Sequence, residues 1–252
     1  MSGGRALAEN LQLDRELPPA TARKETVDIN TIGGITVQEF DWKPLVRNLR
    51  PELDPLATYI PDDQHVLFFK DFSTVITVMD ELKQNSDLPL GFAEGQSEDG
   101  GFQDRYEFQV GLSLTGSVRL LGPKVIRSVA VTGGDLYLRT GTDIAILFEA
   151  VSTQSLKTLL LAQIRGKVRR YQGVTYQRGM IAQVPYVGYA SPDRVVSSYV
   201  ATLGNAVVVT NSLVQMQRLV EVYQQRRPSI AGLDEYIFFR DRYRLGKEDQ
   251  SG

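Results

Sequence analysis

The fold is decided by the stretch from Ser191 to Tyr223, which reads SPDRVVSSYVATLGNAVVVTNSLVQMQRLVEVY. β-Branched and aromatic residues are dense in Val195–Leu203, and the Gly204-Asn205 pair that follows is typical of a tight primed turn. Ala206–Thr210 is then an unbroken apolar run, as in a strand covered on both faces. The sequence therefore predicts a hairpin whose second strand is buried.

An amphipathic helix is predicted directly after this strand. Asn211 or Ser212 can cap it, because either side chain can accept a hydrogen bond from the free N–H groups of the first turn. Apolar residues then recur at steps of three and four and share one face: Leu213, Met216, Leu219, Val220, Val222 and Tyr223. Because Pro228 cannot continue a helix, we expect the helix to end before it and to fold back onto the sheet.

A comparable unit is predicted earlier in the chain. Strands over Ser128–Thr132 and Leu136–Arg139 precede a buried strand over Asp143–Val151, and Thr153 or Ser155 can cap the helix that follows. The apolar face of that helix consists of Leu160, Ile164, Val168 and Tyr171. The two units share no residue-by-residue identity, so we interpret them as recurring strand–strand–helix units and not as a sequence repeat.

The remaining segments complete an α+β pattern. We expect a strand at Val66–Phe69, a helix near Ser73, a helix over Arg105–Leu121 that ends at Gly122-Pro123, and a hairpin that turns around Gln177–Gly179. Runs of hairpins with amphipathic helices predict a mainly antiparallel sheet built from hairpins, with the helices packed on one face.

The predicted domain organisation separates an N-terminal segment from one larger unit. The first residues are polar and mixed in charge, and Trp42 is expected to anchor this segment to the core. We predict an N-terminal tail or arm over 1–57 and an α+β domain over 58–246. A division of that domain into two similar subunits, near 58–172 and 173–246, stays open.

Composition excludes several classes of function. The chain has no cysteine and one histidine, His65, so disulfides, thiol catalysis, cysteine-based zinc sites and multi-histidine metal sites are excluded. The net charge of −2 gives no electrostatic case for nucleic acid, and no cofactor or metal is indicated. The acidic loop over 85–101 lacks the residue spacing of a helix–loop–helix calcium site.

The compartment is also predicted from the sequence. No apolar run approaches the ~18–20 residues that span a membrane, and the N-terminus lacks the ~7–15-residue apolar segment of a signal peptide. We therefore expect a cytoplasmic protein; envelope association stays open if the chain is a fragment. Four cations near a helix end are interpreted as complementing the helix dipole, with a phosphate or nucleic-acid patch as the alternative: Arg165, Lys167, Arg169 and Arg170.

Two features of the chain resemble an uncharacterised group of bacterial proteins with domains of unknown function. One is Ile60-Pro-Asp-Asp63 ahead of a strand; the other is a strand, Thr210-Asn-Ser212, a helix, and Pro228-Ser-Ile230 before an aromatic segment. The resemblance covers residues 58–243. It implies a hairpin-and-helix α+β domain of a type that is often large and exported or envelope-associated, and it implies no catalytic residues.

The C-terminal region has the composition of a protein-interaction surface, because it combines aromatic and arginine side chains. The candidate partner-binding residues are Tyr236, Phe238, Phe239, Arg240, Arg242 and Tyr243. The alternative interpretation places these rings in the core. The sequence thus favours a non-catalytic interaction, structural or scaffolding domain within a larger assembly, bound to a protein partner or to a second copy, with no catalytic residues assigned.

A hydrolase-like enzyme is the alternative function. Asp62, Asp63 and His65 would form its acid–base group, and folding would have to bring a hydroxyl such as Ser191 or Ser197 to them. A histidine beside a buried strand is more often a strand-edge residue. The sequence leaves open the partner or ligand, the oligomeric state, the completeness of the chain and any chemical role of His65.

Overall fold

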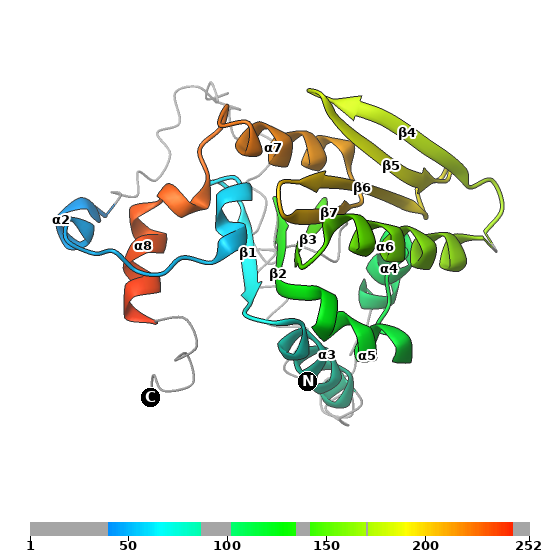
Figure 1. Cartoon of the computed structure of the whole chain (residues 1–252), viewed down its shortest axis with the longest axis horizontal. Helices are drawn as coiled ribbons and strands as arrows, with labels where there is room; N and C mark the ends of the chain where they lie inside the picture. Colours follow the sequence, from blue (N-terminus) through cyan, green and yellow to red (C-terminus); the bar gives the residue numbers. More distant parts are fainter. Residues whose placement is uncertain (1–39, 87–101, 135–141, 170, 244–252) are drawn as a thin grey trace, which may run out of the picture. The chain divides into compact units, whose positions relative to one another are not determined.

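The computed structural model describes residues 40–86, 102–134, 142–169 and 171–243, and those from Trp42 onward belong to one compact unit. A seven-stranded sheet runs through this unit in the order β1-β2-β3-β7-β6-β5-β4, and every neighbouring pair is antiparallel (Figure 1). The strands are β1 (His65–Phe69), β2 (Ile126–Gly133), β3 (Ile144–Ala150), β4 (Thr175–Ile181), β5 (Val184–Ala190), β6 (Ser197–Leu203) and β7 (Ala206–Thr210).

Helices precede, follow and connect these strands. The α-helices are α2 (Lys43–Val46), α3 (Phe72–Ser86), α4 (Phe102–Val110), α5 (Gly116–Val125), α6 (Thr153–Val168), α7 (Leu213–Tyr223) and α8 (Asp234–Arg242). Two short 3₁₀ helices, η2 (Pro55–Tyr59) and η4 (Ile230–Gly232), lie before β1 and before α8.

The two halves of the chain meet at the centre of the sheet. β3 pairs with β7, with Leu147 opposite Val208. Because four successive antiparallel pairings separate β3 from β4 in the strand order, these two strands run in the same direction, and α6 is the crossover between them. The regions 58–172 and 173–246 therefore contribute to one shared sheet.

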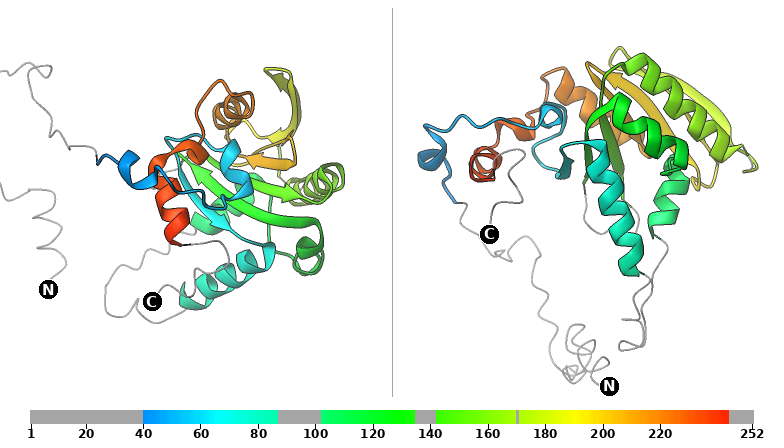
Figure 2. Two further views of the ribbon diagram at one scale, coloured as in Figure 1. Left: turned by 60° about the vertical axis from the view of Figure 1, so that its left-hand side comes forward. Right: turned by 60° about the horizontal axis from the view of Figure 1, so that its bottom comes forward.

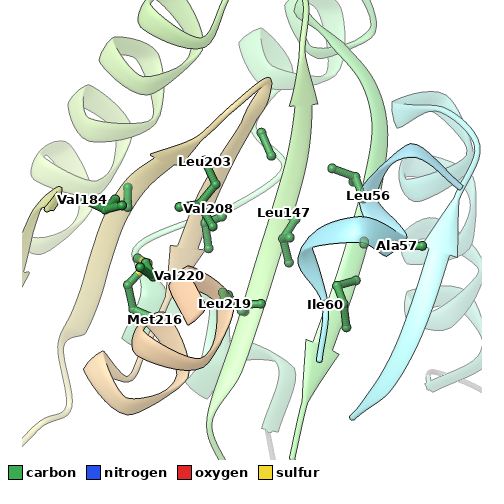
Figure 3. Packing of buried hydrophobic residues seen from close by; sticks show 14 of the residues in the cluster. Leu56, Ala57, Ile60, Leu147, Val184, Leu203, Val208, Met216, Leu219 and Val220 are labelled. Atoms are coloured by element: carbon green, nitrogen blue, oxygen red, sulfur yellow. The ribbon is translucent and has the colours of Figure 1, made fainter. Parts of the chain in front are cut away.

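Helices cover both faces of the sheet. On one face, Leu56 of η2, Leu147 of β3 and Met216 of α7 belong to one core cluster (Figure 3). On the other face, Phe72 of α3 and Ile164 of α6 belong to a second cluster, and Figure 2 shows α6 and α7 on opposite sides of the strands. The predicted α+β class with a mainly antiparallel sheet is confirmed. The detail that the helices pack on one face is wrong, because both faces of the central strands are apolar and each needs a cover.

β7 is the doubly covered strand that the sequence predicts. Ala206 and Val208 point into one core cluster, Val207 and Val209 point into the other, and all four are fully buried. Gly204 takes a φ of 56° at the preceding turn, as the first position of a primed turn requires. The central hairpin of the fold is therefore correctly predicted.

The helix caps lie one or two residues from several predicted positions. Ser212 caps α7 as one of the two predicted candidates, since its Oγ accepts from the Gln215 N–H. Ser152, and not Thr153 or Ser155, caps α6. At the start of α3, Asp71 accepts from the Thr74 N–H at 2.7 Å, so the cap of the helix predicted near Ser73 is Asp71 and not Ser73, although the serine hydroxyl can also cap a helix. Neighbouring polar residues offer equivalent caps, and the backbone direction selects among them.

The hairpin between β4 and β5 turns at a different place from the one predicted. The turn lies at Ala182-Gln183, whose φ values are 44° and 70°, and not around Gln177–Gly179. Two non-glycine residues at positive φ give no turn signal in the sequence. Gly179 lies inside β4, where an added Cβ would be 2.5 Å from the Tyr186 hydroxyl oxygen.

Other differences concern the region between β1 and β3. The helix predicted over Arg105–Leu121 is two helices, α4 and α5, separated by a loop in which Gly111 takes a φ of 70°. The predicted stop at Gly122-Pro123 is wrong, because α5 continues through Pro123, which lies in its last turn. The strand predicted over Leu136–Arg139 and most of the acidic loop lie outside the described residues.

Part of the segment predicted as an N-terminal arm contributes to the core. Leu56 and Ala57 of η2 are 1% and 0% exposed and pack against β-sheet residues of the first core cluster. Residues 1–39 lie outside the described residues.

Candidate functional site

Four aromatic rings form a continuous cluster where α2 meets α8. The ring centroid of Trp42 lies 5.2 Å from that of Phe238 and 5.7 Å from that of Phe239, and Tyr243 stacks on Phe239 with a centroid distance of 6.2 Å. Phe239 and Tyr243 are 39% and 40% exposed. We call Trp42, Phe238, Phe239 and Tyr243 the aromatic surface.

The helix that carries Phe238 and Phe239, α8, has no buried residue. The sequence of α8, DEYIFFRDR, has four consecutive large apolar residues between charged ends; at 100° per residue they spread around the helix and leave no apolar stripe. None of its nine residues, all of which the structure describes, is buried. Tyr236 packs partly buried against the first core cluster, whereas Phe239 is exposed at the surface.

Polar contacts dock α8 on the loop before η2. The Tyr236 hydroxyl donates to Asp54 Oδ2 at 2.6 Å and accepts from the Asp54 backbone N–H at 3.0 Å. Arg240 Nε forms an ion pair with the same Oδ2 at 3.2 Å, in a setting where both side chains are largely buried. Burial, together with the hydrogen bond to Asp54, raises the pKa of the Tyr236 hydroxyl well above its ordinary value.

The structure divides the six candidate partner-binding residues into two groups. Tyr236 and Arg240 make contacts inside the chain, to Asp54. The remaining four lie on the accessible part of α8 or just after it: Phe238, Phe239, Arg242 and Tyr243. Trp42 belongs to the same cluster, although the sequence predicts it only as the anchor of the arm. No periodicity or motif links it to α8, so its place beside these rings is visible only in the fold.

The residues of the alternative hydrolase hypothesis lie around the start of β1. Asp63 forms ion pairs with Arg218 at 2.5 Å and Arg227 at 3.5 Å, both from the α7 region. Asp62 is partly exposed and His65 is exposed at the edge of the sheet. Both carboxylate oxygens of Asp63 are therefore engaged by arginines of the α7 region.

The serines that this hypothesis requires are held elsewhere. Ser197 is in β6, four strand spacings from β1, which corresponds to about 19 Å. Its buried hydroxyl donates to the Asn211 carbonyl at 2.7 Å. The Ser191 hydroxyl donates to Asp193 Oδ1 at 2.5 Å. The fold therefore does not bring His65 and Ser197 together.

On the sheet face opposite η2 and α7, helices α3, α4, α5 and α6 surround a cavity of about 260 Å³. Phe72, Val75 and Met79 of α3 and Val118 of α5 form walls, and apolar side chains of β2 and β3 such as Ile146 form the floor. Only Glu107, Ser113 and Gln163 among its described lining residues are polar or charged, apart from the hydroxyl of Tyr106. We call this space the apolar cavity.

Three side chains at the margin of the apolar cavity, Gln163, Tyr106 and Glu107, have partners within the chain. The Gln163 side-chain amide donates to the Ser113 carbonyl at 2.6 Å, and the Tyr106 hydroxyl accepts from the Thr142 N–H at 3.0 Å. The Glu107 carboxylate lies 3.9 Å from Lys167 Nζ. The cavity therefore presents hydrocarbon to its interior.

One of the four cations at the end of α6, Lys167, makes hydrogen bonds within the domain. Lys167 donates to the carbonyl oxygens of Glu107 and Leu112 at 2.9 and 3.0 Å, so it fastens α4 and the loop after it to α6. Arg170 lies outside the described residues. Lys167 thus joins two helices, a different role from the predicted complementing of the dipole of its own helix.

The described part of the chain has neither a side-chain cluster that could hold a metal ion nor a helix that could cross a membrane. Within 40–86, 102–134, 142–169 and 171–243, no group of three or more His, Asp or Glu side chains is arranged to hold a metal ion. Over the same ranges, no helix combines the length and the apolar character that crossing a membrane demands.

Comparison of the chain with protein-family models, with curated proteins and with solved structures found no match. The comparisons therefore assign no family.

Proposed function

We propose that this chain is a non-catalytic protein-binding domain that works within a larger assembly and that docks its protein partner on the aromatic surface. The observation that carries the proposal is the exposure of Phe239 and Tyr243 within a cluster of four rings that a polar contact to Asp54 holds in place. Aromatic and arginine side chains dominate the energetics of protein interfaces. Arg242 is exposed at the end of α8 and adds an arginine to the aromatic side chains of this region.

The construction of α8 supports this assignment. A helix without buried residues gains little from packing, yet Tyr236 and Arg240 fix it through a largely buried carboxylate. That arrangement presents rigid rings instead of a mobile tail, and pre-organised rings lose less conformational entropy when a partner binds. A partner with an apolar protrusion, on another protein or on a second copy of this chain, would fit such a surface.

Site-specific photocrosslinking tests the proposal in cells that make the full chain. A photoreactive benzoyl-phenylalanine replaces Tyr243, and the same residue replaces Val214, which is 68% exposed on α7, as the control. We expect a discrete protein adduct from position 243 and none of that mass from position 214. An adduct at both positions, or at neither, contradicts docking on the aromatic surface.

A second variant measures how much the aromatic surface contributes to the binding free energy of the partner. Phe239→Ala removes an exposed ring without touching the Asp54 contact, so the domain stays folded. We expect it to weaken the captured complex by about 2 kcal/mol, or roughly thirtyfold, as truncation of an interface hot spot does. Unchanged affinity would place the binding surface elsewhere on the domain.

A further inference from the structure

We propose that the apolar cavity is a second, independent binding site, and that it takes an uncharged alkyl chain. The cavity lies on the opposite face of the sheet from η2 and α7, and no residue of the aromatic surface lines it. The inference rests on three properties of the cavity: the rigidity of its walls, the chemistry of its lining and its size.

The walls are joined by close helix contacts, so the space is preformed. An added Cβ at Gly122 of α5 would lie 2.3 Å from a ring carbon of Phe72, which shows how closely α5 approaches α3. A Cβ at Gly111 would lie 3.0 Å from Ile164 Cγ2 in α6. The Gln163–Ser113 hydrogen bond adds a further tie to the loop between α4 and α5. Loose packing of the helices therefore does not account for the space between them.

The lining sets the chemistry of the ligand. Glu107 is paired with Lys167, and both Gln163 and the Tyr106 hydroxyl are hydrogen-bonded within the chain. A charged or strongly polar group inside the cavity would lose its water among side chains that are almost all apolar or already paired, which is unfavourable. A hydrocarbon group would instead gain contacts with aliphatic and aromatic walls. The complementary ligand is uncharged and apolar.

The size of the cavity favours a narrow ligand. Its volume of about 260 Å³ lies just below the ~300–1,000 Å³ of sites for drug-sized molecules. An apolar cavity of about 150 Å³ with a similar lining stays dry and binds benzene. A flexible alkyl chain fits an intermediate volume, and the Met79 side chain in the wall can adjust to its end.

Fluorescence titration of the full chain tests this assignment. The probe is 1-N-phenylnaphthylamine, an uncharged apolar fluorophore, and the competitors are 1-decanol and 1,10-decanediol. We expect saturable binding of the probe, displacement by decanol, and at least about tenfold weaker displacement by the diol, because one of its hydroxyls would be buried without a partner. Equal displacement by both competitors overturns the proposed chemistry.

A matched pair of variants places the ligand. Val118→Trp puts an indole into the cavity, whereas Val214→Trp makes the same change at an exposed position of α7. We expect at least a tenfold loss of probe affinity in V118W and none in V214W. If thermal unfolding shows that V118W does not fold, Val75→Phe fills the same space from α3.

Two results would overturn the proposal of an alkyl-binding site. Absence of saturable binding by the full chain, or binding that folded V118W or Val75→Phe retains unchanged, means that no alkyl ligand occupies the cavity. In that case another part of the chain or a protein partner fills it. The photocrosslinking result at position 243 does not depend on this outcome, so the two proposals fail separately.

Discussion

Asp54 is the residue on which the position of α8 depends. Its carboxylate takes a hydrogen bond from Tyr236 and an ion pair from Arg240, and its backbone N–H returns a hydrogen bond to the Tyr236 oxygen. Asp54 and Tyr236 are 182 residues apart in the sequence. A buried carboxylate is stable only when such partners are present, so the three residues act together.

Tyr236→Phe tests this contact. We expect a loss of about 1–3 kcal/mol in the free energy of unfolding at neutral pH, because the Asp54 N–H loses its acceptor and its carboxylate loses a donor. Urea unfolding measures the loss. Tyr243→Phe, on an exposed ring, is the control and should change stability by less than about 0.5 kcal/mol. Equal effects of the two variants would contradict the role of Asp54.

The contribution of Tyr236 to the free energy of unfolding should depend on pH, and the direction of that dependence follows from its raised pKa. The pKa of Tyr236 is raised by burial and by Asp54, so above pH ~10 the folded state holds a proton that the unfolded state has lost. Its contribution to stability is complete below pH ~10 and falls as the pH rises further. The stability difference between the wild type and Tyr236→Phe should therefore narrow above that pH.

At the candidate site, the sequence predicts the type of surface but not the role of each side chain. The composition of residues 236–243 is enough to name an interaction surface, because aromatic and arginine side chains are visible without a fold. The distinction between Tyr236, which docks the helix, and Phe239, which is exposed, depends on Asp54. No local pattern connects side chains so distant in sequence.

At the scale of elements, α7 is tied to the segment before β1 by a buried amide pair. Gln64 and Gln215 exchange two side-chain hydrogen bonds of 2.6 and 2.8 Å, and Thr132 donates a third to Gln64 Oε1 at 3.0 Å. Gln215 is fully buried on the face of α7 that packs on the sheet. The helix is thus held in one register by hydrogen bonds as well as by its apolar stripe.

A double-mutant cycle measures the coupling free energy between Gln64 and Gln215. Gln64→Leu and Gln215→Leu should each cost about 1–3 kcal/mol of unfolding free energy, because each leaves a buried amide without its partner. The double variant should cost less than the sum, since no amide remains unsatisfied. Gln217→Leu, on the exposed side of α7, is the control. Strict additivity in chemical unfolding would contradict the coupling.

Elements with strong local signals are the ones that the sequence predicts well. β7 has the predicted bounds, and α7 begins at a predicted cap, because apolar runs and capping side chains act over a few residues. The Ala182-Gln183 turn escapes prediction because tertiary structure imposes its positive φ values. The split between α4 and α5 at Gly111 depends on the close approach of Ile164 from α6.

At the scale of the whole molecule, stability should be graded from the centre of the sheet outward. β3 and β7 are each paired on both sides, and their side chains are covered on both faces. α8, in contrast, has no buried residue. Amides with few buried contacts open in local fluctuations, whereas central amides exchange only when the whole domain unfolds.

Hydrogen exchange read by mass spectrometry checks this gradient. We expect amides of α8 to exchange on the order of a hundredfold or more faster than those of β3 and β7. Peptides from the edge strands β1 and β4 should fall between these limits. Uniform protection across the sheet and α8 would show that the aromatic surface is as firmly integrated as the core.

The strand order lies beyond what the sequence predicts. The alternating apolar residues identify most strands and the class of fold, but they do not say that β7 inserts between β3 and β6. Nor do they say that α6 and α7 cover opposite faces, because both helices carry similar stripes. These choices are made by packing between residues far apart in the chain.

The pairing of β3 with β7 has a consequence during synthesis on the ribosome. β3 emerges early, but β7, one of its two neighbours, is made only after α6, β4, β5 and β6. At about 5–20 residues per second, the roughly 60 residues between them take several seconds to translate. For that interval the nascent chain carries an apolar strand with an open edge, which is a template for aggregation. Translation speed through residues 150–210 and chaperone access to β3 therefore bear directly on the yield of folded protein.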